Sequence, residues 1–287
     1  MTHQAYAYYP GCSLSSTARE YDVSTRKVFE ALGLELRELE DWSCCGASAA
    51  KGINHLLGLA LPGRVIQQAE EANLPLTTPC PECYSRLRFA AYEMKDEATR
   101  KQVSQVLETE IKNTGAIEPT LKIIWQYDGD LRIKKPLTGL KAVAYYGCLF
   151  VRPKDVAAFD DQEDPRSMDD IVTRLGVEML DWGFKTECCG AYLSVPKPEI
   201  VYRLVYRILK GAKQAGADCV VVACPLCQAN LDTRQKAIEE RYRVHFDLPI
   251  IYFTQLMGLA MGFSAQELLL DKHLTDPLPL LRGKGLA

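Results

Sequence analysis

The 287-residue sequence has no long uninterrupted apolar run, no strong net charge and only four histidines. Its longest apolar stretch, residues 250–263, is interrupted by Thr254 and Gln255 and falls short of the roughly 20 residues that span a bilayer. A formal net charge of −3 without a basic stripe argues against nucleic acid as the main partner. No secretory signal opens the sequence, so we expect a cytoplasmic protein without a membrane span of its own.

The sequence also lacks the motifs of several common enzyme classes. It offers no Ser/His/Asp triad and no flavin or nucleotide fingerprint, so electrons for any redox reaction would have to come from another protein. The histidines are scattered and are expected to be surface or core residues, although His55 follows Cys45 by ten residues and is a candidate for a place near a cysteine site. They are His3, His55, His245 and His273.

Cysteine, by contrast, is abundant, with eleven residues. Cytoplasmic thiols stay reduced, so this number indicates metal or redox chemistry rather than a disulfide scaffold. Ten of the eleven fall into two groups with one order: a lone cysteine, an adjacent pair followed by Gly-Ala, and a Cys-Pro-x-Cys motif. The first cysteine group is Cys12, Cys44, Cys45, Cys80 and Cys83, and the second cysteine group is Cys148, Cys188, Cys189, Cys224 and Cys227. The remaining Cys219 lies in an apolar strand and is expected to be a buried structural residue.

The repeated order of cysteines predicts an internal duplication. In both groups 34 residues separate the adjacent pair from the Cys-Pro-x-Cys motif, and residues 142–148 repeat residues 5–12 with one deletion. Residues 134–139 are predicted to form the linker, which gives an N-terminal domain over residues 1–135 and a C-terminal domain with a tail over residues 136–287. A pseudo-twofold arrangement of the two would bring the cysteine groups face to face.

Strands and helices alternate in each half, which predicts two pseudo-symmetric parallel α/β domains. Residues 5–9, 34–39 and 74–78 are predicted strands of the first half, and residues 218–223 and 250–253 of the second. Thr17 and Glu20 have capping-box spacing for a helix that ends at Gly33, and Cys12 is expected in a turn. Residues 97–114 are predicted to form a polar helix, and Pro81 to be the first residue of another.

Five thiols in each half suggest a large inorganic group. Thiolates select zinc or iron–sulfur chemistry, but a structural zinc ion and an ordinary cubane cluster each take four ligands. Five cysteines with one adjacent pair fit a larger iron–sulfur assembly. A thioredoxin-like dithiol would explain only four of the cysteines, and zinc in one half with iron–sulfur in the other stays open as an alternative.

The doubled pattern of Cys, Cys-Cys-Gly and Cys-Pro-x-Cys resembles the cysteine-rich CCG domain, and nearly the whole chain is similar to the B subunit of heterodisulfide reductase. The resemblance implies two noncubane [4Fe-4S] clusters, one per half, bound by the ten cysteines of the two groups. It implies an oxidoreductase acting on sulfur groups, which in the family splits the disulfide of coenzymes M and B between the clusters. It also implies two partners from the same complex, the C subunit with cubane iron–sulfur clusters and the A subunit with a flavin.

Three functions follow as hypotheses. The first is the catalytic subunit of a heterodisulfide reductase-like complex that reduces or forms a disulfide or related sulfur substrate. The second is electron transfer between a flavoprotein and a quinone-reactive membrane partner, and the third is a zinc-bearing interaction module. An anionic substrate would need cations near the clusters, for which the candidates are Lys51, Arg64, Lys185 and Lys197, although solvated surface residues are the simpler interpretation of each. The acidic residues 159–164 and the tail, residues 264–287, are candidates for docking a partner.

Overall fold

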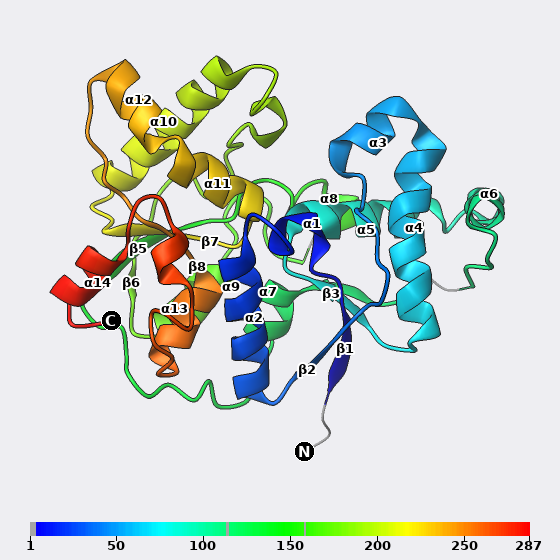
Figure 1. Ribbon diagram of the computed structural model, residues 1–287, viewed down its shortest axis with the longest axis horizontal. Coiled ribbons are helices and arrows are strands. Elements are labelled where there is room, and N and C mark those ends of the chain that lie inside the picture. The colour runs from blue at the N-terminus through cyan, green and yellow to red at the C-terminus, as the bar shows by residue number, and fades with distance from the viewer. Residues whose placement is uncertain (1–3, 113–114, 158) are drawn as a thin grey trace.

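Two four-stranded parallel sheets form the framework of the protein (Figure 1). The computed structural model describes residues 4–112, 115–157 and 159–287. The first sheet has the order β2-β1-β3-β4 and the second the order β6-β5-β7-β8, with every strand pair parallel. The predicted duplicated α/β architecture is therefore confirmed. The strands are β1 (Ala5–Tyr8), β2 (Glu35–Glu38), β3 (Leu76–Thr78), β4 (Ile117–Pro119), β5 (Lys141–Tyr145), β6 (Glu178–Met179), β7 (Cys219–Val222) and β8 (Ile250–Tyr252).

Helices connect successive strands in both halves. The first half contains α1 (Gly11–Leu14), α2 (Arg19–Leu32), α3 (Ala47–Ile53), α4 (His55–Glu71), α5 (Pro81–Glu93), α6 (Glu97–Leu107) and α7 (Thr120–Trp125). The second half contains α8 (Lys154–Ala157), α9 (Ser167–Arg174), the 3₁₀ turn η1 (Ala191–Leu193), α10 (Pro198–Gln214), α11 (Pro225–Thr233) and α12 (Gln235–Tyr242). It ends with α13 (Phe253–Ala260), the 3₁₀ turn η2 (Leu270–Lys272) and α14 (Leu278–Gly283).

Local sequence explains where several of these elements begin and end. Strand β7 is Cys-Val-Val-Val with all four residues buried, as expected for an inner strand of a parallel sheet covered on both faces. Helix α2 ends at Gly33, whose φ of 75° is left-handed and therefore favours glycine. Pro81 and Pro225 occupy the first positions of α5 and α11, where the missing N–H has no partner to lose.

Three local predictions were wrong. Thr17 does not cap a helix, because α2 begins at Arg19 and its N-cap residue is Ala18, which makes no side-chain capping bond. Cys12 lies in the single-turn helix α1 rather than in a turn. Helix α6 ends at Leu107, because Glu108 adopts a left-handed conformation, so the helix is shorter than the predicted range of residues 97–114. Residues 113 and 114 of that prediction lie outside the described residues.

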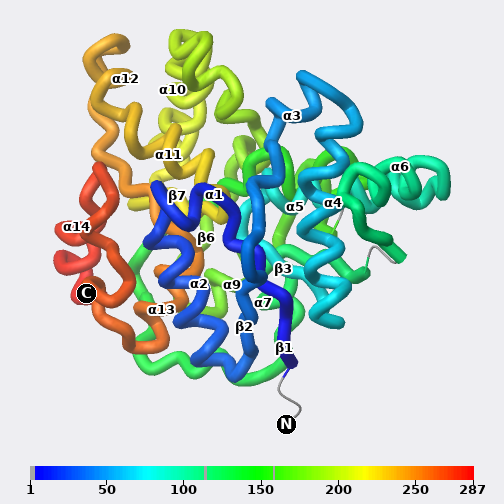
Figure 2. Tube along the Cα trace, turned by 45° about the vertical axis from the view of Figure 1, so that its right-hand side comes forward, coloured from blue at the N-terminus to red at the C-terminus, as the bar shows by residue number. Residues whose placement is uncertain are grey.

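The two halves share one continuous apolar core. Helix α2 of the first half packs against α13 of the second, and Figures 1 and 2 both show the two helices side by side. The tail also joins the halves, because Glu267 is 3.5 Å from the Lys27 ammonium of α2. In the part of the chain that the structure describes, every helix is too short or too polar to cross a membrane.

Candidate functional site

The cysteines of both groups follow the carboxyl ends of strands. In the first half, Cys12 follows β1, the pair Cys44-Cys45 follows β2, Cys80 is the N-cap residue of α5 after β3, and Cys83 lies in the first turn of α5. The chain order reverses between β1 and β3, which are neighbours in the sheet, and this switch point is where open parallel sheets form a crevice. The second half repeats the arrangement on β5, β6 and β7. The topology therefore brings distant cysteines to one edge of each sheet.

The structure brings all five thiols of the first cysteine group together. The Sγ atoms of Cys12 and Cys44 are 3.8 Å apart, and those of Cys45 and Cys83 are 3.6 Å apart. Cys44 interacts with Cys45, and Cys83 with Cys80, which completes a continuous chain of five sulfurs.

The second cysteine group forms in the same way. The Sγ atoms of Cys189 and Cys227 are 3.6 Å apart, Cys148 interacts with Cys188, and Cys227 with Cys224. Each group has a buried floor and an open side. The buried members are Cys45, Cys80, Cys83, Cys189, Cys224 and Cys227, while Cys12, Cys44 and Cys188 are exposed and Cys148 is intermediate. The eleventh cysteine, Cys219, is buried in β7, where burial raises the pKa of its thiol to about 12.

The environment favours thiolates at defined positions. Hydrogen bonds with Cys44 and Cys83 lower the pKa of Cys45 to about 3, and the bond with Cys148 lowers the pKa of Cys188 to about 6. The backbone N–H of Gly46 donates to the Cys44 sulfur at 3.4 Å, and that of Gly190 to the Cys188 sulfur at 3.3 Å. The same hydrogen bonds raise the pKa of the partner thiols Cys44 and Cys148, so each group contains at least one sulfur that is favoured as a thiolate, the form that binds metals.

Glycine allows the backbone to approach these sulfurs closely. A Cβ atom on Gly11 would lie 2.8 Å from the Cys83 Sγ, and one on Gly147 would lie 2.9 Å from the Cys227 Sγ. Both glycines also have a left-handed φ, 72° and 67°. The residue before each lone cysteine is thus glycine for two independent steric reasons.

Two buried tyrosines hold the adjacent cysteine pairs, a role that the sequence did not reveal. The Tyr9 hydroxyl donates to the carbonyl of Ser43 at 2.9 Å, and the Tyr145 hydroxyl donates to the carbonyl of Glu187 at 2.6 Å. Each acceptor is the residue immediately before a Cys-Cys pair. Burial, followed by the surrounding cysteines, raises the pKa of both phenols. The available signal was their position, because each of these tyrosines stands three residues before the lone cysteine of its half.

A small cavity beside the second cysteine group is enclosed mainly by sulfur atoms and apolar side chains. It is bounded by all five thiols and by apolar side chains, including Leu149 and Leu226, and by Pro81 from the first half. Among the described residues, no set of three or more His, Cys, Asp or Glu side chains is arranged to hold a single metal ion. The donor set, five soft thiols in each half, is of the type that binds iron–sulfur clusters.

Sequence comparison matches this doubled site to a known family. The profile described as "CCG: Cysteine-rich domain" matches residues 6–88 and residues 142–232. The chain belongs to the CCG cysteine-rich domain family. The CCG match covers both cysteine groups completely, so the predicted resemblance is confirmed.

Curated relatives resemble the whole CCG protein. An 8-methylmenaquinol:fumarate reductase membrane anchor subunit from Wolinella succinogenes is 33% identical over 96% of this chain and 98% of its own length. The B subunit of a ferredoxin/F420H2-dependent CoB-CoM heterodisulfide reductase from Methanosarcina acetivorans is 27% identical, with 94% of both chains covered. A protein from Archaeoglobus profundus, described as like the B subunit of heterodisulfide reductase, is 28% identical over 91% of this chain and 92% of its own.

One solved structure shares the CCG protein's fold. The crystal structure of a hypothetical protein from Helicobacter pylori matches 95% of the chain with a TM-score of 0.79 at 13% identity. Our chain spans about half of that protein, 52% of its length.

The two CCG sites differ at two equivalent positions. The variable residue of the Cys-Pro-x-Cys motif is Glu82 in the first half and Leu226 in the second. Three residues after each motif stand Arg86, whose guanidinium is 3.7 Å from Glu82, and Asn230, whose amide donates to the Cys189 sulfur at 3.6 Å. The Tyr192 hydroxyl, from the second half, donates to the Glu82 carboxylate. The first site therefore carries a carboxylate–guanidinium pair at these positions, whereas the second carries an uncharged leucine and amide.

The four cations proposed to bind an anionic substrate differ in their burial and in their partners. Lys51 lies 3.9 Å above the Phe89 ring, and Lys197 is exposed at the start of α10. Arg64 pairs with Asp41 at 2.6 Å. Lys185 is buried and pairs with Asp164 at 2.8 Å and with Asp169 at 3.2 Å, so its charge is already neutralised.

The acidic residues 159–164 also have partners within their own half. Asp160 accepts from the backbone N–H groups of Arg166 and Ser167, and Asp164 binds Arg166 as well as Lys185. These carboxylates stabilise the loop to which they belong, which leaves less free charge for docking a partner than the sequence suggested. His55 lies on the surface, 3.9 Å from Glu93.

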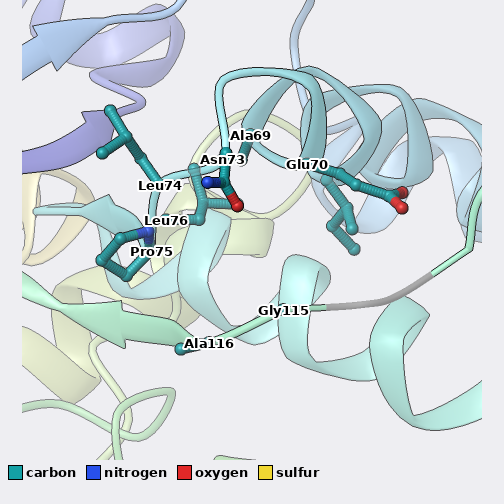
Figure 3. Close-up of a pocket in the computed structure, with 9 residues that line it drawn as sticks. Ala69, Glu70, Asn73, Leu74, Pro75, Leu76, Gly115 and Ala116 are labelled. Carbon is teal, nitrogen blue, oxygen red and sulfur yellow. The ribbon is translucent and has the colours of Figure 1, made fainter.

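A separate cavity of about 320 Å³ lies at the other edge of the first CCG sheet (Figure 3). It is formed between the end of α4 and the start of β3, with Glu70, Asn73, Pro75 and Ala116 among its lining residues. Because β3 runs from this cavity toward Cys80, the cavity is at the amino edge of the sheet and the thiols are at the carboxyl edge. It takes no part in the cysteine sites.

Proposed function

We propose that this CCG protein is the iron–sulfur subunit of a heterodisulfide reductase-like complex. In this proposal the two cysteine groups each bind one noncubane [4Fe-4S] cluster, and a disulfide or related sulfur substrate is reduced or formed between them. The observation that carries the proposal is the presence of two complete groups of five thiols, each gathered at the carboxyl edge of its own sheet. Relatives of nearly equal length that are named as B subunits of heterodisulfide reductases support it.

The chain's own residues supply binding and orientation. Two clusters, when bound, supply one electron each, which matches the two electrons that cleavage of a disulfide bond consumes. The buried cysteines of each group would hold the inner side, and the exposed Cys12, Cys44 and Cys188 the outer side. Glu82 and Arg86 give the first site a polar wall, whereas Leu226 and the ring of Tyr192 line the second site. We infer that an asymmetric substrate would bind in one preferred orientation for this reason.

Partner proteins are part of the proposal. The sequence contains no flavin or nucleotide motif, so the cubane-cluster C subunit and the flavin-binding A subunit of such a complex are the proposed route for electrons. The proposed location of the complex is the cytoplasm.

A second function is favoured by one specific observation. The relative with 33% identity is named a membrane anchor subunit of a menaquinol:fumarate reductase. In this alternative the chain would pass electrons between a flavoprotein and a quinone-reactive membrane partner. Ile53 and Val195 follow the two cysteine pairs and are 80% and 89% exposed, and we infer that these two side chains would contact such a partner.

The deciding experiment is anaerobic purification with iron and acid-labile sulfide analysis, followed by EPR after thiols are added to the oxidised protein. About eight irons per chain and a thiol-dependent signal are expected if two four-iron clusters act on sulfur. Iron that responds to a menaquinol analogue but not to thiols would favour the second function. Zinc in place of iron would exclude both.

Matched variants make the iron analysis specific to each site. Cys12→Ser and Cys148→Ser are each expected to lose one of the two clusters, so that about four irons remain. Cys219→Ala is the control, because Cys219 lies in β7 outside both groups and its replacement should leave the iron content unchanged.

A further inference from the structure

One tyrosine contacts both Cys-Pro-x-Cys motifs. Tyr21 lies on α2, is fully buried, and its hydroxyl is 3.3 Å from the carbonyl oxygen of Pro79 and 3.1 Å from that of Ala223. Pro79 immediately precedes Cys80 and Ala223 immediately precedes Cys224. The Tyr21 hydroxyl therefore lies between two carbonyl oxygens that occupy equivalent positions in the two halves.

The ring of Tyr21 is fixed by the second half of the protein. It stacks on Tyr252 with ring centroids 4.2 Å apart and an angle of 4° between the rings, and the edge of Phe253 packs against it. Burial, followed by Cys224 and Cys80, raises the pKa of the Tyr21 phenol, which places this side chain within electrostatic reach of a cysteine from each group. Figure 1 shows α2 between the two halves.

We propose that Tyr21 is a positioning residue shared by the two cysteine groups, whose hydroxyl fixes the separation of the two Cys-Pro-x-Cys motifs. This inference rests on the proposed function and deepens it, since one substrate can react with both sites only if their spacing is defined. The hydroxyl has one proton for two carbonyl oxygens, so a bifurcated hydrogen bond ties both motifs to one atom. A shift of about 1 Å in the placement of reacting groups can change a rate by about a hundredfold.

The same helix offers a matched control. Ser24 lies one turn after Tyr21, and its Oγ is 2.7 Å from the Oγ1 of Thr254 in the second half. Both Tyr21→Phe and Ser24→Ala remove one buried hydrogen bond between the halves. Each also removes one bond within the first half, from Tyr21 to the Pro79 carbonyl or from Ser24 to the Tyr21 carbonyl at 3.2 Å. Only Tyr21→Phe affects carbonyls that adjoin cysteines, so a general loosening of the interface would appear in both variants.

The first measurement is hydrogen–deuterium exchange on the full chain. Tyr21→Phe is expected to speed exchange in the segments around residues 80–83 and 224–227 together by about fivefold, because both carbonyls lose their partner. Tyr9→Phe should act only near residues 43–46, and Tyr145→Phe only near residues 187–190. An effect of Tyr21→Phe on one motif alone, or on neither, would overturn the shared role.

The second measurement separates positioning from simple support of the fold. In the iron-loaded protein, Tyr21→Phe should keep the wild-type iron content but change the EPR interaction between the two clusters. It should lower kcat for disulfide cleavage about tenfold or more, with KM within about twofold, because placement affects the reaction step more than binding. Ser24→Ala should stay within about twofold of wild type in both constants.

These results also separate the inference from the proposed function. An iron-free wild type would end the cluster proposal, and the exchange experiment would still decide whether Tyr21 joins the two motifs. Iron-loaded Tyr21→Phe protein with an unchanged EPR interaction and an unchanged kcat would overturn the inference and leave the proposed function intact.

Discussion

At the scale of single residues, the immediate neighbours of the thiols determine how closely the backbone approaches each sulfur and which hydrogen bonds surround it. The closest constraint is steric: Gly11 and Gly147 leave no room for a methyl group beside Cys83 and Cys227. Two hydrogen bonds also repeat in both halves. In one, a glycine N–H donates to the sulfur of the first cysteine of the adjacent pair. In the other, a tyrosine hydroxyl donates to the carbonyl of the residue before that pair. Repetition of the same contacts on two copies of the fold indicates that they belong to the site and not to one half alone.

The steric constraint gives a prediction with an internal control. Gly11→Ala and Gly33→Ala place alanine at nearly the same φ, 72° and 75°, and each should lower the free energy of unfolding by about 1–2 kcal/mol. Only Gly11→Ala meets a sulfur, whereas a Cβ on Gly33 has no atom within 4 Å among the described residues. Urea unfolding and iron analysis would test this. Gly11→Ala should lose the first cluster and Gly33→Ala should not, and equal iron contents would contradict the steric argument.

At the scale of elements, helix α11 carries Cys227 and anchors the tail. His273 is buried between two amides: its Nδ1 is 3.0 Å from the Gln228 Nε2 on α11, and its Nε2 is 2.9 Å from the Gln255 Oε1 on α13. Asp232, also on α11, accepts from the backbone N–H groups of Leu274 and Thr275. The tail therefore fixes the helix that follows the second Cys-Pro-x-Cys motif.

The buried histidine predicts a pH dependence of stability. Burial lowers the pKa of His273, against the opposing influence of Asp232, so the imidazole is neutral in the folded protein near pH 7. Its contribution is complete above the unfolded pKa of about 6.5 and is lost as the pH falls below that value, because the unfolded chain then binds the proton more readily. Thermal unfolding at pH 7.5 and 5.5 should show a larger loss for wild type than for His273→Gln. Equal losses would exclude His273 as the source.

At the scale of the whole molecule, the two halves are bound by aromatic and polar contacts at several places. Tyr21 stacks on Tyr252, Tyr84 packs against Phe150, and the Tyr84 hydroxyl donates to the Ala157 carbonyl at 3.0 Å. Tyr21 lies on α2 and Tyr84 on α5, the helix that carries Cys83 of the first cysteine group. The interface between the halves is thus continuous with the site.

This continuity predicts that the halves do not fold independently. The full chain should unfold in a single urea transition, because the apolar core runs through both halves. A fragment of residues 1–135 would expose the Tyr21 and Tyr84 rings, and we expect it to lack the dispersed NMR spectrum of a folded domain. A folded fragment would show instead that the domain boundary predicted at residue 135 is also a folding boundary.

Sequence alone was sufficient to predict the duplication, the parallel α/β class and the grouping of ten cysteines, because each depends on spacing that repeats along the chain. It also identified Pro81 and Gly33 correctly, since the backbone requirements of these residues are local. It failed at Thr17, whose capping pattern is short, and at Lys185, whose burial depends on Asp164 and Asp169 reaching it from other segments.

How the two sites lie relative to each other depends on tertiary packing. Tyr9 and Tyr145 reach carbonyls 34 and 42 residues away, and Tyr21 reaches Ala223 across 202 residues. Hydrogen bonds of this kind leave no periodic trace in a sequence, because a tyrosine at such a position is indistinguishable from any other core aromatic until the chain has folded. The cysteine groups are therefore set by repeated spacing, whereas their mutual placement is set by packing.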